Sequence, residues 1–195
     1  MPRTPWLVAL LLIAACPKRT EIIDLTNPAN APKSLLDCPV GTKEFGQLPP
    51  MGTEMWCAKD GSDGTQPVRH GPSRSWYSDG RPQSAGPYAE GVRTGHWWYW
   101  TQEGHIEREG EYLSGSETGY WTNYRDDGTV VAEGPMKDGG KNGVWVSFDA
   151  ANGVPQEGTW VDGQKDGTWV EYDAEGKAIR ERVFRLGRQI SQHEL

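Results

Sequence analysis

Aromatic and glycine residues stand among polar residues in a pattern that repeats every 24 positions from Gly71 onward. Six columns hold over five units, and each unit is numbered here from its first glycine as position 0. Position 0 is Gly71, Gly95, Gly119, Gly143 and Gly167, and position 2 is Ser73, Trp97, Trp121, Trp145 and Trp169. Position 5 is Trp76, Trp100, Tyr124, Phe148 and Tyr172, and position 15 is Gly86, Gly110, Gly134, Gly158 and Arg182. Position 17 is Tyr88, Tyr112, Met136, Trp160 and Phe184, and position 20 is Gly91, Gly115, Gly139, Gly163 and Gly187. Such a period is typical of a repeat architecture.

Turn residues lie in the middle of every unit, between the aromatic runs. Asp79-Gly80 is the first such pair, and equivalents follow in each unit, with Asn152-Gly153 one residue late in the fourth. Pairs of this type predict hairpins with two-residue type I′ turns. We therefore expect an all-β fold, an elongated twisted antiparallel sheet of about five 24-residue hairpins. The displaced pair predicts a longer turn or a bulge in the fourth unit.

A two-residue turn at positions 8 and 9 places position 2 opposite position 15, and position 17 opposite position 0. The rings at positions 2 and 17 are then expected to lie over bare glycine backbone on the neighbouring strand, which would explain both glycine columns. The tryptophan at position 2 would be core, and the aromatic at position 5 would lie on the opposite face of the sheet.

The position 5 column is the candidate binding surface: Trp76, Trp100, Tyr124, Phe148 and Tyr172. Opposite these rings, at position 12, the predicted register places a mixed and partly polar set: Gln83, Glu107, Val131, Pro155 and Ile179. We therefore expect the face that carries position 5 to be less completely packed than the face that carries the position 2 tryptophans. The position 5 aromatics are accordingly expected to contribute more to recognition than to folding, the alternative being that they too are core.

Composition supports a folded, acidic β-protein. Ten Trp, seven Tyr and 25 Gly argue against disorder, which is poor in aromatics. The net charge is −7, and residues 71–195 hold 13 Lys and Arg against 20 Asp and Glu. No nucleic-acid partner is expected, because phosphate binding needs a basic face. The same acidity disfavours anionic lipid headgroups as a ligand of the repeats.

The N-terminal 15 residues are interpreted as a signal peptide. A ten-residue apolar run from Trp6 to Ala15 is too short to span a bilayer but fits the apolar region of a secretory signal. Ile13-Ala14-Ala15-Cys16 resembles the lipobox of bacterial lipoproteins, in which the cysteine is acylated and becomes the new N-terminus. This predicts anchoring in a lipid bilayer through Cys16, in the cell envelope and with the outer membrane favoured. The alternatives are an ordinary secretory signal with a passive Cys16, or a retained anchor helix.

Between the signal and the repeats, residues 16–50 are proline-rich and are interpreted as a tether. Residues 51–70 are expected to form an N-terminal cap on a repeat domain spanning 71–195.

With Cys16 acylated, Cys38 and Cys57 are left to form a disulfide in an oxidising compartment. Two free buried cysteines are the alternative, and a zinc site is disfavoured because two cysteines fall short of a ligand set.

The stretch from Gly95 to Gly104 followed by Gly110 to Gly115 resembles the MORN-variant repeat of bacterial proteins, in which G-x-W-x-x-Y, a turn glycine and G-x-Y-x-x-G follow in order. The resemblance covers about Gly71 to Gly187. It implies a hairpin-repeat fold, and since several members of that family are named as antitoxins, it implies a binding role without catalytic residues.

No pattern for an enzyme is found among the nucleophiles and histidines. His105, Glu107 and Glu109 alternate along one strand and could share a cation, but a solvated polar face is the better interpretation, so no metal or other cofactor is expected. Three functional classes remain: a protein-interaction scaffold or antitoxin-like binder, a glycan-binding surface formed by the aromatic ladder, and a purely structural envelope protein. We expect a protein partner, which the sequence does not identify.

Overall fold

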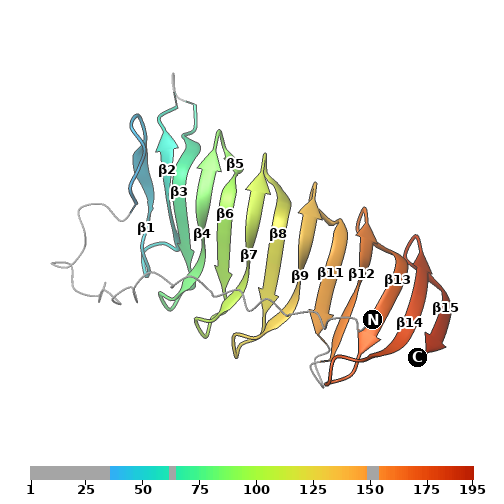
Figure 1. Ribbon diagram of the computed structural model, residues 1–195. Coiled ribbons are helices and arrows are strands. Elements are labelled where there is room, and N and C mark those ends of the chain that lie inside the picture. Colours follow the sequence, from blue (N-terminus) through green and yellow to red (C-terminus); the bar gives the residue numbers. More distant parts are fainter. Residues whose placement is uncertain (1–35, 62–64, 149–153) are drawn as a thin grey trace, which may run out of the picture. The chain divides into compact units, whose positions relative to one another are not determined.

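The computed structural model describes residues 36–61, 65–148 and 154–195, and within these residues every element is a strand. The strands form one open antiparallel sheet (Figure 1), which confirms the predicted fold class. They are β1 (Lys43–Gln47), β2 (Glu54–Lys59), β3 (Val68–Trp76), β4 (Pro82–Ala89), β5 (Val92–Arg93), β6 (Gly95–Trp100), β7 (Ile106–Leu113), β8 (Ser116–Tyr124), β9 (Val130–Lys137), β10 (Gly140–Lys141), β11 (Gly143–Phe148), β12 (Pro155–Val161), β13 (Gln164–Tyr172), β14 (Ala178–Arg185) and β15 (Arg188–Glu194).

Strand order follows chain order, so that each hairpin pairs with the hairpins before and after it. The sheet runs from β1 to β15 without a crossover, and the short strands β5 and β10 pair only with β4 and β9. Hairpins are added side by side along the sheet, which twists over its length (Figure 1). A single layer of this kind has two faces, and the alternation of side chains decides what each face carries.

The turns inside the repeats are not the predicted two-residue type I′ turns. The Tyr77 amide donates to the Arg81 carbonyl and the Gly80 amide donates to the Tyr77 carbonyl, so three residues form the loop. Gly80 has φ +87° whereas Asp79 is not left-handed, which is the type I turn closed by a left-handed glycine. Three other units repeat both bonds, at Thr101–His105, Arg125–Thr129 and Asp173–Lys177. Asp-Gly suits both turn types, which explains the error.

A bulge in the same hairpins compensates for the longer loop. Trp76 pairs with Pro82 and Ser75 pairs with Ser84, so Gln83 is an extra residue. From there on the register is the predicted one. The residues opposite the position 5 aromatics are therefore Pro82, Ile106, Val130, Pro155 and Ala178, and the predicted position 12 set is wrong except at Pro155.

Of the two alternatives predicted for the fourth hairpin, a longer turn or a bulge, the bulge is absent from its described strands. From Gly143 to Phe148 strand β11 pairs with β12 without a register shift, and the bulge occurs in the other four hairpins instead. The turn at residues 149–153, where a longer loop was expected, lies outside the described residues.

Type I′ turns do occur, but between the repeats. Glu90 and Gly91 have φ +47° and +83°, and Ala89 pairs with Val92 across them. The same two-residue turn recurs at Ser114-Gly115, Asp138-Gly139, Asp162-Gly163 and Leu186-Gly187. The position 20 glycine column is thus explained by the positive φ that the second turn residue requires.

The predicted pairing of Trp97 with Gly110 and of Gly95 with Tyr112 is confirmed. The tryptophan ring, however, covers the glycine of the preceding hairpin. A Cβ on Gly86 would lie 2.3 Å from the Trp97 ring, and a Cβ on Gly110 would lie 2.2 Å from the Trp121 ring. Rings over bare glycine are therefore present as predicted, but each joins two consecutive repeats.

The position 0 glycines have a different cause from the one predicted. Gly95, Gly119 and Gly167 have φ between +59° and +69°, at the point where each repeat's first strand breaks register with the strand before it. No ring lies against them, and a Cβ on Gly167 would meet nothing within 4 Å. Backbone conformation, not ring packing, selects glycine here.

The core is a row of aromatic side chains on one face of the sheet, the tryptophan face, defined by Trp97, Trp121, Trp145 and Trp169. These four rings are only 1–3% exposed. Tyr112 lies edge-on between Trp97 and Trp121, with ring centroids 5.9 and 5.4 Å away. The indole nitrogen of each tryptophan donates to a backbone carbonyl. A thin sheet thereby obtains a continuous core, as predicted for position 2.

Cations cover this aromatic row on its solvent side. Arg93 lies 4.8 Å from the Trp97 ring centroid, Lys141 4.0 Å from Trp145, and Lys165 3.9 Å from Trp169. All three occupy position 22 of their units. In the unit where Glu117 holds that position, Arg108 from the neighbouring strand covers Trp121 at 4.6 Å and forms an ion pair with Glu117. The half-buried aliphatic parts of these Arg and Lys side chains, together with the cation–π contacts, thus cover the solvent side of the core.

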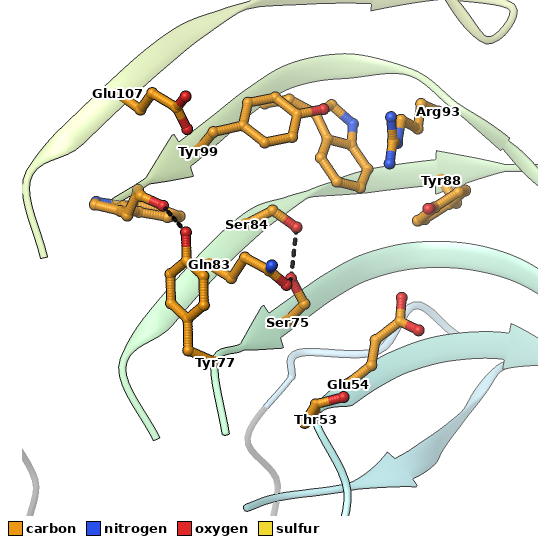
Figure 2. A pocket seen from close by; sticks show the side chains of 12 residues that line it. Thr53, Glu54, Ser75, Tyr77, Gln83, Ser84, Tyr88, Arg93, Tyr99 and Glu107 are labelled. Carbon is orange, nitrogen blue, oxygen red and sulfur yellow. Dashed lines mark hydrogen bonds between the residues drawn. The ribbon is translucent and has the colours of Figure 1, made fainter. Parts of the chain in front are cut away.

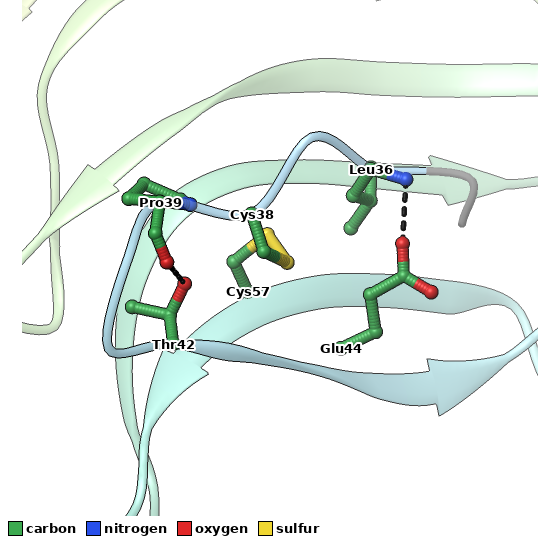
Figure 3. Close-up of a disulfide and its surroundings, with 6 residues drawn as sticks. All are labelled: Leu36, Cys38, Pro39, Thr42, Glu44 and Cys57. Atoms are coloured by element: carbon green, nitrogen blue, oxygen red, sulfur yellow. Dashed lines mark hydrogen bonds between the residues drawn. A yellow bond between two sulfur atoms is a disulfide. The ribbon is translucent and has the colours of Figure 1, made fainter. Parts of the chain in front are cut away.

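The N-terminal cap begins earlier than predicted. β1 lies within residues 16–50, which the sequence assigned to the tether, and the folded unit starts at Leu36 rather than at residue 51. The predicted disulfide between Cys38 and Cys57 is present, with Cα atoms 5.5 Å apart (Figure 3). It ties the segment before β1 to β2, beside a buried Leu36 whose amide donates to Glu44 Oε1 at 2.6 Å.

Candidate functional site

The face opposite the tryptophan row carries a column of carboxylates at position 14, and is called here the acidic face. Its members are Glu109, Glu133, Glu157 and Glu181, one per repeat from the second repeat to the fifth. Tyr124 donates its hydroxyl to Glu109 at 2.7 Å, and Tyr172 donates to Glu157 at 2.5 Å. Each bond joins a position 5 tyrosine to the glutamate of the preceding repeat. The acidic column and the predicted binding column therefore form one surface.

These bonds shift the proton affinity of both tyrosines. Burial and the bond to Glu109 raise the pKa of Tyr124 to about 12. The bond to Glu157, together with burial, raises the pKa of Tyr172 to about 12. Burial disfavours the charged phenolate, and a hydroxyl that donates to a carboxylate must keep its proton; burial is the larger cause at Tyr124 and the hydrogen bond is the larger cause at Tyr172.

The five predicted binding residues do not behave alike. Trp76 is only 7% exposed, so little of its ring is accessible to a partner, which argues against its assignment as a binding residue. Trp100, Tyr124, Phe148 and Tyr172 are half-buried. Two of them are held by hydrogen bonds within the sheet, so their rings present a fixed edge to solvent rather than a free side chain.

Sequence reasoning missed three large exposed side chains of this face. Trp98 is 37% exposed, Tyr120 56% and Val144 57%. They stand at positions 1 and 3, which share the parity of position 5 along the strand, and this parity was the available signal. Large exposed apolar side chains beside regularly spaced carboxylates are features of a recognition surface.

His96 organises the carboxylates at one point of the acidic face. Its two ring nitrogens lie 3.0 Å from Glu111 Oε1 and 3.0 Å from Glu109 Oε2, and its ring packs against Trp98. Glu109 is thus held by His96 and Tyr124 rather than grouped with His105. In the part of the chain that the structure describes, no group of three or more His, Cys, Asp or Glu side chains is arranged to hold a metal ion.

The two faces of the sheet differ in charge, which the acidic net charge does not reveal. Arg69, Arg93, Arg108, Lys141 and Lys165 cover rings on the tryptophan face, whereas the position 14 carboxylates are all on the other. Burial lowers the pKa of Lys141 and of Lys165, since each ammonium lies over indole rings. Arg69 and Arg108 are paired with Glu54 and Glu117, so the tryptophan face carries both signs of charge, whereas the position 14 column is uniformly acidic.

A hollow of about 460 Å³ opens on the tryptophan face at the first repeat (Figure 2). Ser75 and Ser84 meet at its floor, with their hydroxyl oxygens 2.7 Å apart. Arg93 and Tyr88 lie at one end, and Tyr77 and Gln83 lie at the other (Figure 2). Sequence analysis did not find this hollow.

No protein-family model matches the chain, and a search of curated proteins gives no significant match. Over residues 36–61, 65–148 and 154–195 the structure contains no helix long and apolar enough to cross a membrane. Cys16 and the signal segment lie outside the described residues.

Proposed function

We propose that this chain is a non-enzymatic, lipid-anchored envelope protein whose repeat sheet acts as a protein-interaction scaffold, and that its acidic face binds a basic segment of a partner protein. One observation carries the proposal: the exposed Trp98, Tyr120 and Val144 share a face with the repeated glutamates. Aromatic anchors supply affinity and the carboxylates select a partner of positive charge. Antitoxin-like binding, implied by the resemblance to MORN-variant repeats, is one form of this role.

Two alternatives have less support. A glycan stacked on the tryptophan ladder would need exposed ring faces, whereas Trp97, Trp121, Trp145 and Trp169 are covered by cations and neighbouring rings. A purely structural role does not account for the exposure of Trp98, Tyr120 and Val144 on the same face as the repeated glutamates.

The interface is tested with the Trp98→Ala/Tyr120→Ala double variant. Proteins captured from envelope extract by the wild-type chain are identified, purified and measured for direct binding. The double variant should weaken binding at least tenfold, and Glu133→Gln/Glu181→Gln should reduce the dependence of binding on salt. Ile190→Ala is the matched control, because Ile190 is 59% exposed on the terminal strand β15. Equal binding by the double variant and the control would refute the acidic face as the interface.

Lipid anchoring is tested separately through Cys16. Its support is the lipobox-like Ile13-Ala14-Ala15-Cys16 after a short apolar run. The Cys16→Ala variant should move the protein from the membrane fraction to a soluble or unprocessed form. Pro17 stands where an inner-membrane retention signal would place Asp, so we favour the outer membrane. Unchanged processing and membrane retention in the variant would contradict the proposal.

A further inference from the structure

The hollow on the tryptophan face arises where the first repeat departs from the second. The second repeat has Trp97, Tyr99 and Arg108 at positions 2, 4 and 13, and these side chains fill the face. The first repeat has Ser73, Ser75 and Ser84 at the same positions. Ser75 and Ser84 line the hollow, and their hydroxymethyl groups in place of a tyrosine and an arginine leave the space of about 460 Å³, which is within the usual range of ligand sites.

Arg93 gives this hollow a positive charge that has no ion-pair partner among the described residues. Its guanidinium packs on the rings of Trp97 and Tyr112 and interacts with the Tyr88 hydroxyl, but among the described residues it forms no ion pair. The neighbouring arginines differ, since Arg69 is paired with Glu54 and Arg108 with Glu117. A planar guanidinium held in place by ring packing presents a rigid fork that suits a carboxylate.

Apart from Glu54 and Glu107, the rest of the hollow is neutral and polar on one side and aromatic on the other. Ser75, Ser84 and Gln83 offer hydroxyl and amide groups, and the rings of Tyr88 and Tyr99 form a wall. Hydroxyls and amides opposite an aromatic wall suit a sugar ring, which has hydroxyls at its rim and C–H groups on its faces.

The charge balance of the hollow favours a monoanion. Arg93 is its one cation without an ion-pair partner in the described part of the lining, and Glu54 and Glu107 also line the hollow. Glu54 is already paired with Arg69, so Glu107 is the carboxylate that remains. A phosphate dianion would add two negative charges beside Glu107 with one guanidinium to compensate, whereas a single carboxylate matches Arg93. We propose that the hollow binds a uronic acid unit of an acidic polysaccharide, with the carboxylate on Arg93 and the ring hydroxyls on Ser75, Ser84 and Gln83. This site is independent of the acidic face, which lies on the other side of the sheet.

The proposal is tested by NMR titration of the protein with galacturonate and trigalacturonate, against galactose, acetate and inorganic phosphate. Amide shifts are expected in β3, β4 and β6, with trigalacturonate binding at least tenfold more tightly than galactose or acetate, since each of these lacks one of the two elements recognised. Absence of uronate binding at millimolar concentration, or equal binding of acetate, galactose or phosphate, would overturn it.

Two variants separate recognition from folding. Arg93→Gln should weaken trigalacturonate binding at least tenfold, but Arg93 also covers Trp97. The Ser75→Tyr variant keeps Arg93 and installs the second repeat's own residue at position 4, so it should fill the hollow and abolish binding while the midpoint of thermal unfolding is kept. The control is Asn123→Tyr, at position 4 of the third repeat, which should bind as the wild type does. Undiminished binding by the filled variant would place the site elsewhere and refute the assignment.

Discussion

Replacing Gly110 by alanine tests the contact that joins one repeat to the next. Gly110 has ordinary φ, so the substitution adds no backbone strain, but its Cβ would lie 2.2–2.5 Å from three atoms of the Trp121 ring. Trp121 is 2% exposed and its indole nitrogen donates to the carbonyls of Glu111 and Thr118, both at 3.1 Å. The ring must therefore shift within a packed row and lose these bonds.

The expected cost follows from these contacts. Overpacking a core costs about 1–3 kcal/mol, and a weakened hydrogen bond adds about 1 kcal/mol. We expect Gly110→Ala to lower the free energy of unfolding by about 3 kcal/mol. For a folded unit of this size each kcal/mol corresponds to roughly 2–4 °C, so the midpoint should fall by about 6–12 °C.

A double-mutant cycle identifies the cause. Trp121→Ala alone should cost about 3–5 kcal/mol. In Gly110→Ala/Trp121→Ala the added Cβ no longer meets a ring, so the double variant should be no less stable than Trp121→Ala. Gly167→Ala is the control for backbone strain alone, because Gly167 has φ +69° and open space around it, and it should cost about 1–2 kcal/mol. Additive effects in the cycle, measured by denaturant and thermal unfolding, would refute the ring contact as the reason for this glycine.

Three further predictions concern the cap, the acidic face and a turn. Cys57→Ser should lower the free energy of unfolding by about 3 kcal/mol, because the disulfide closes a 19-residue separation; reductant should do the same to the wild type, and no loss on full reduction would contradict this. Tyr124 and Tyr172 have pKa values raised from 10.0 to about 12 in the folded protein, so the stability they contribute is present below pH 10 and lost as the pH rises to 12; denaturant unfolding across this range should show a shallower decline in Tyr124→Phe/Tyr172→Phe, and an unchanged decline would refute the linkage. Leu186→Asn should raise stability by about 1 kcal/mol, because Leu186 has φ +49° in a type I′ turn that favours Asn; an unchanged melting temperature would contradict it.

The period of 24 residues made most of the sheet predictable, because a register repeated five times leaves little freedom. What the period did not determine is how each turn is built. Asp79-Gly80 fits a two-residue turn and also a three-residue turn closed by glycine, and the two differ by one residue in register. The bulge at Gln83 cancels that difference, so the pairing of Trp97 with Gly110 was predicted correctly although the turn was not.

The cation row was missed for a different reason. Arg93, Lys141 and Lys165 share position 22, but Glu117 interrupts the column and conceals it. Only the structure shows that Arg108, from another column, supplies the missing cation over Trp121. Because the cation that replaces Glu117 comes from position 13 and not from position 22, neither the composition nor the 24-residue period reveals the replacement.

The last glycine of position 15 and its replacement by Arg182 show which residues define a repeat. Position 15 is glycine wherever the following repeat brings a tryptophan, and the column ends in Arg182, whose successor in the tryptophan column is His193. Arg182 instead forms an ion pair with Glu171 and a hydrogen bond with Gln192 of β15. Because no ring must be accommodated there, the glycine is dispensable and a polar side chain ends the core. The unit of stability is therefore the glycine of one hairpin together with the tryptophan of the next, so cohesion between hairpins, more than any single hairpin, holds the sheet together.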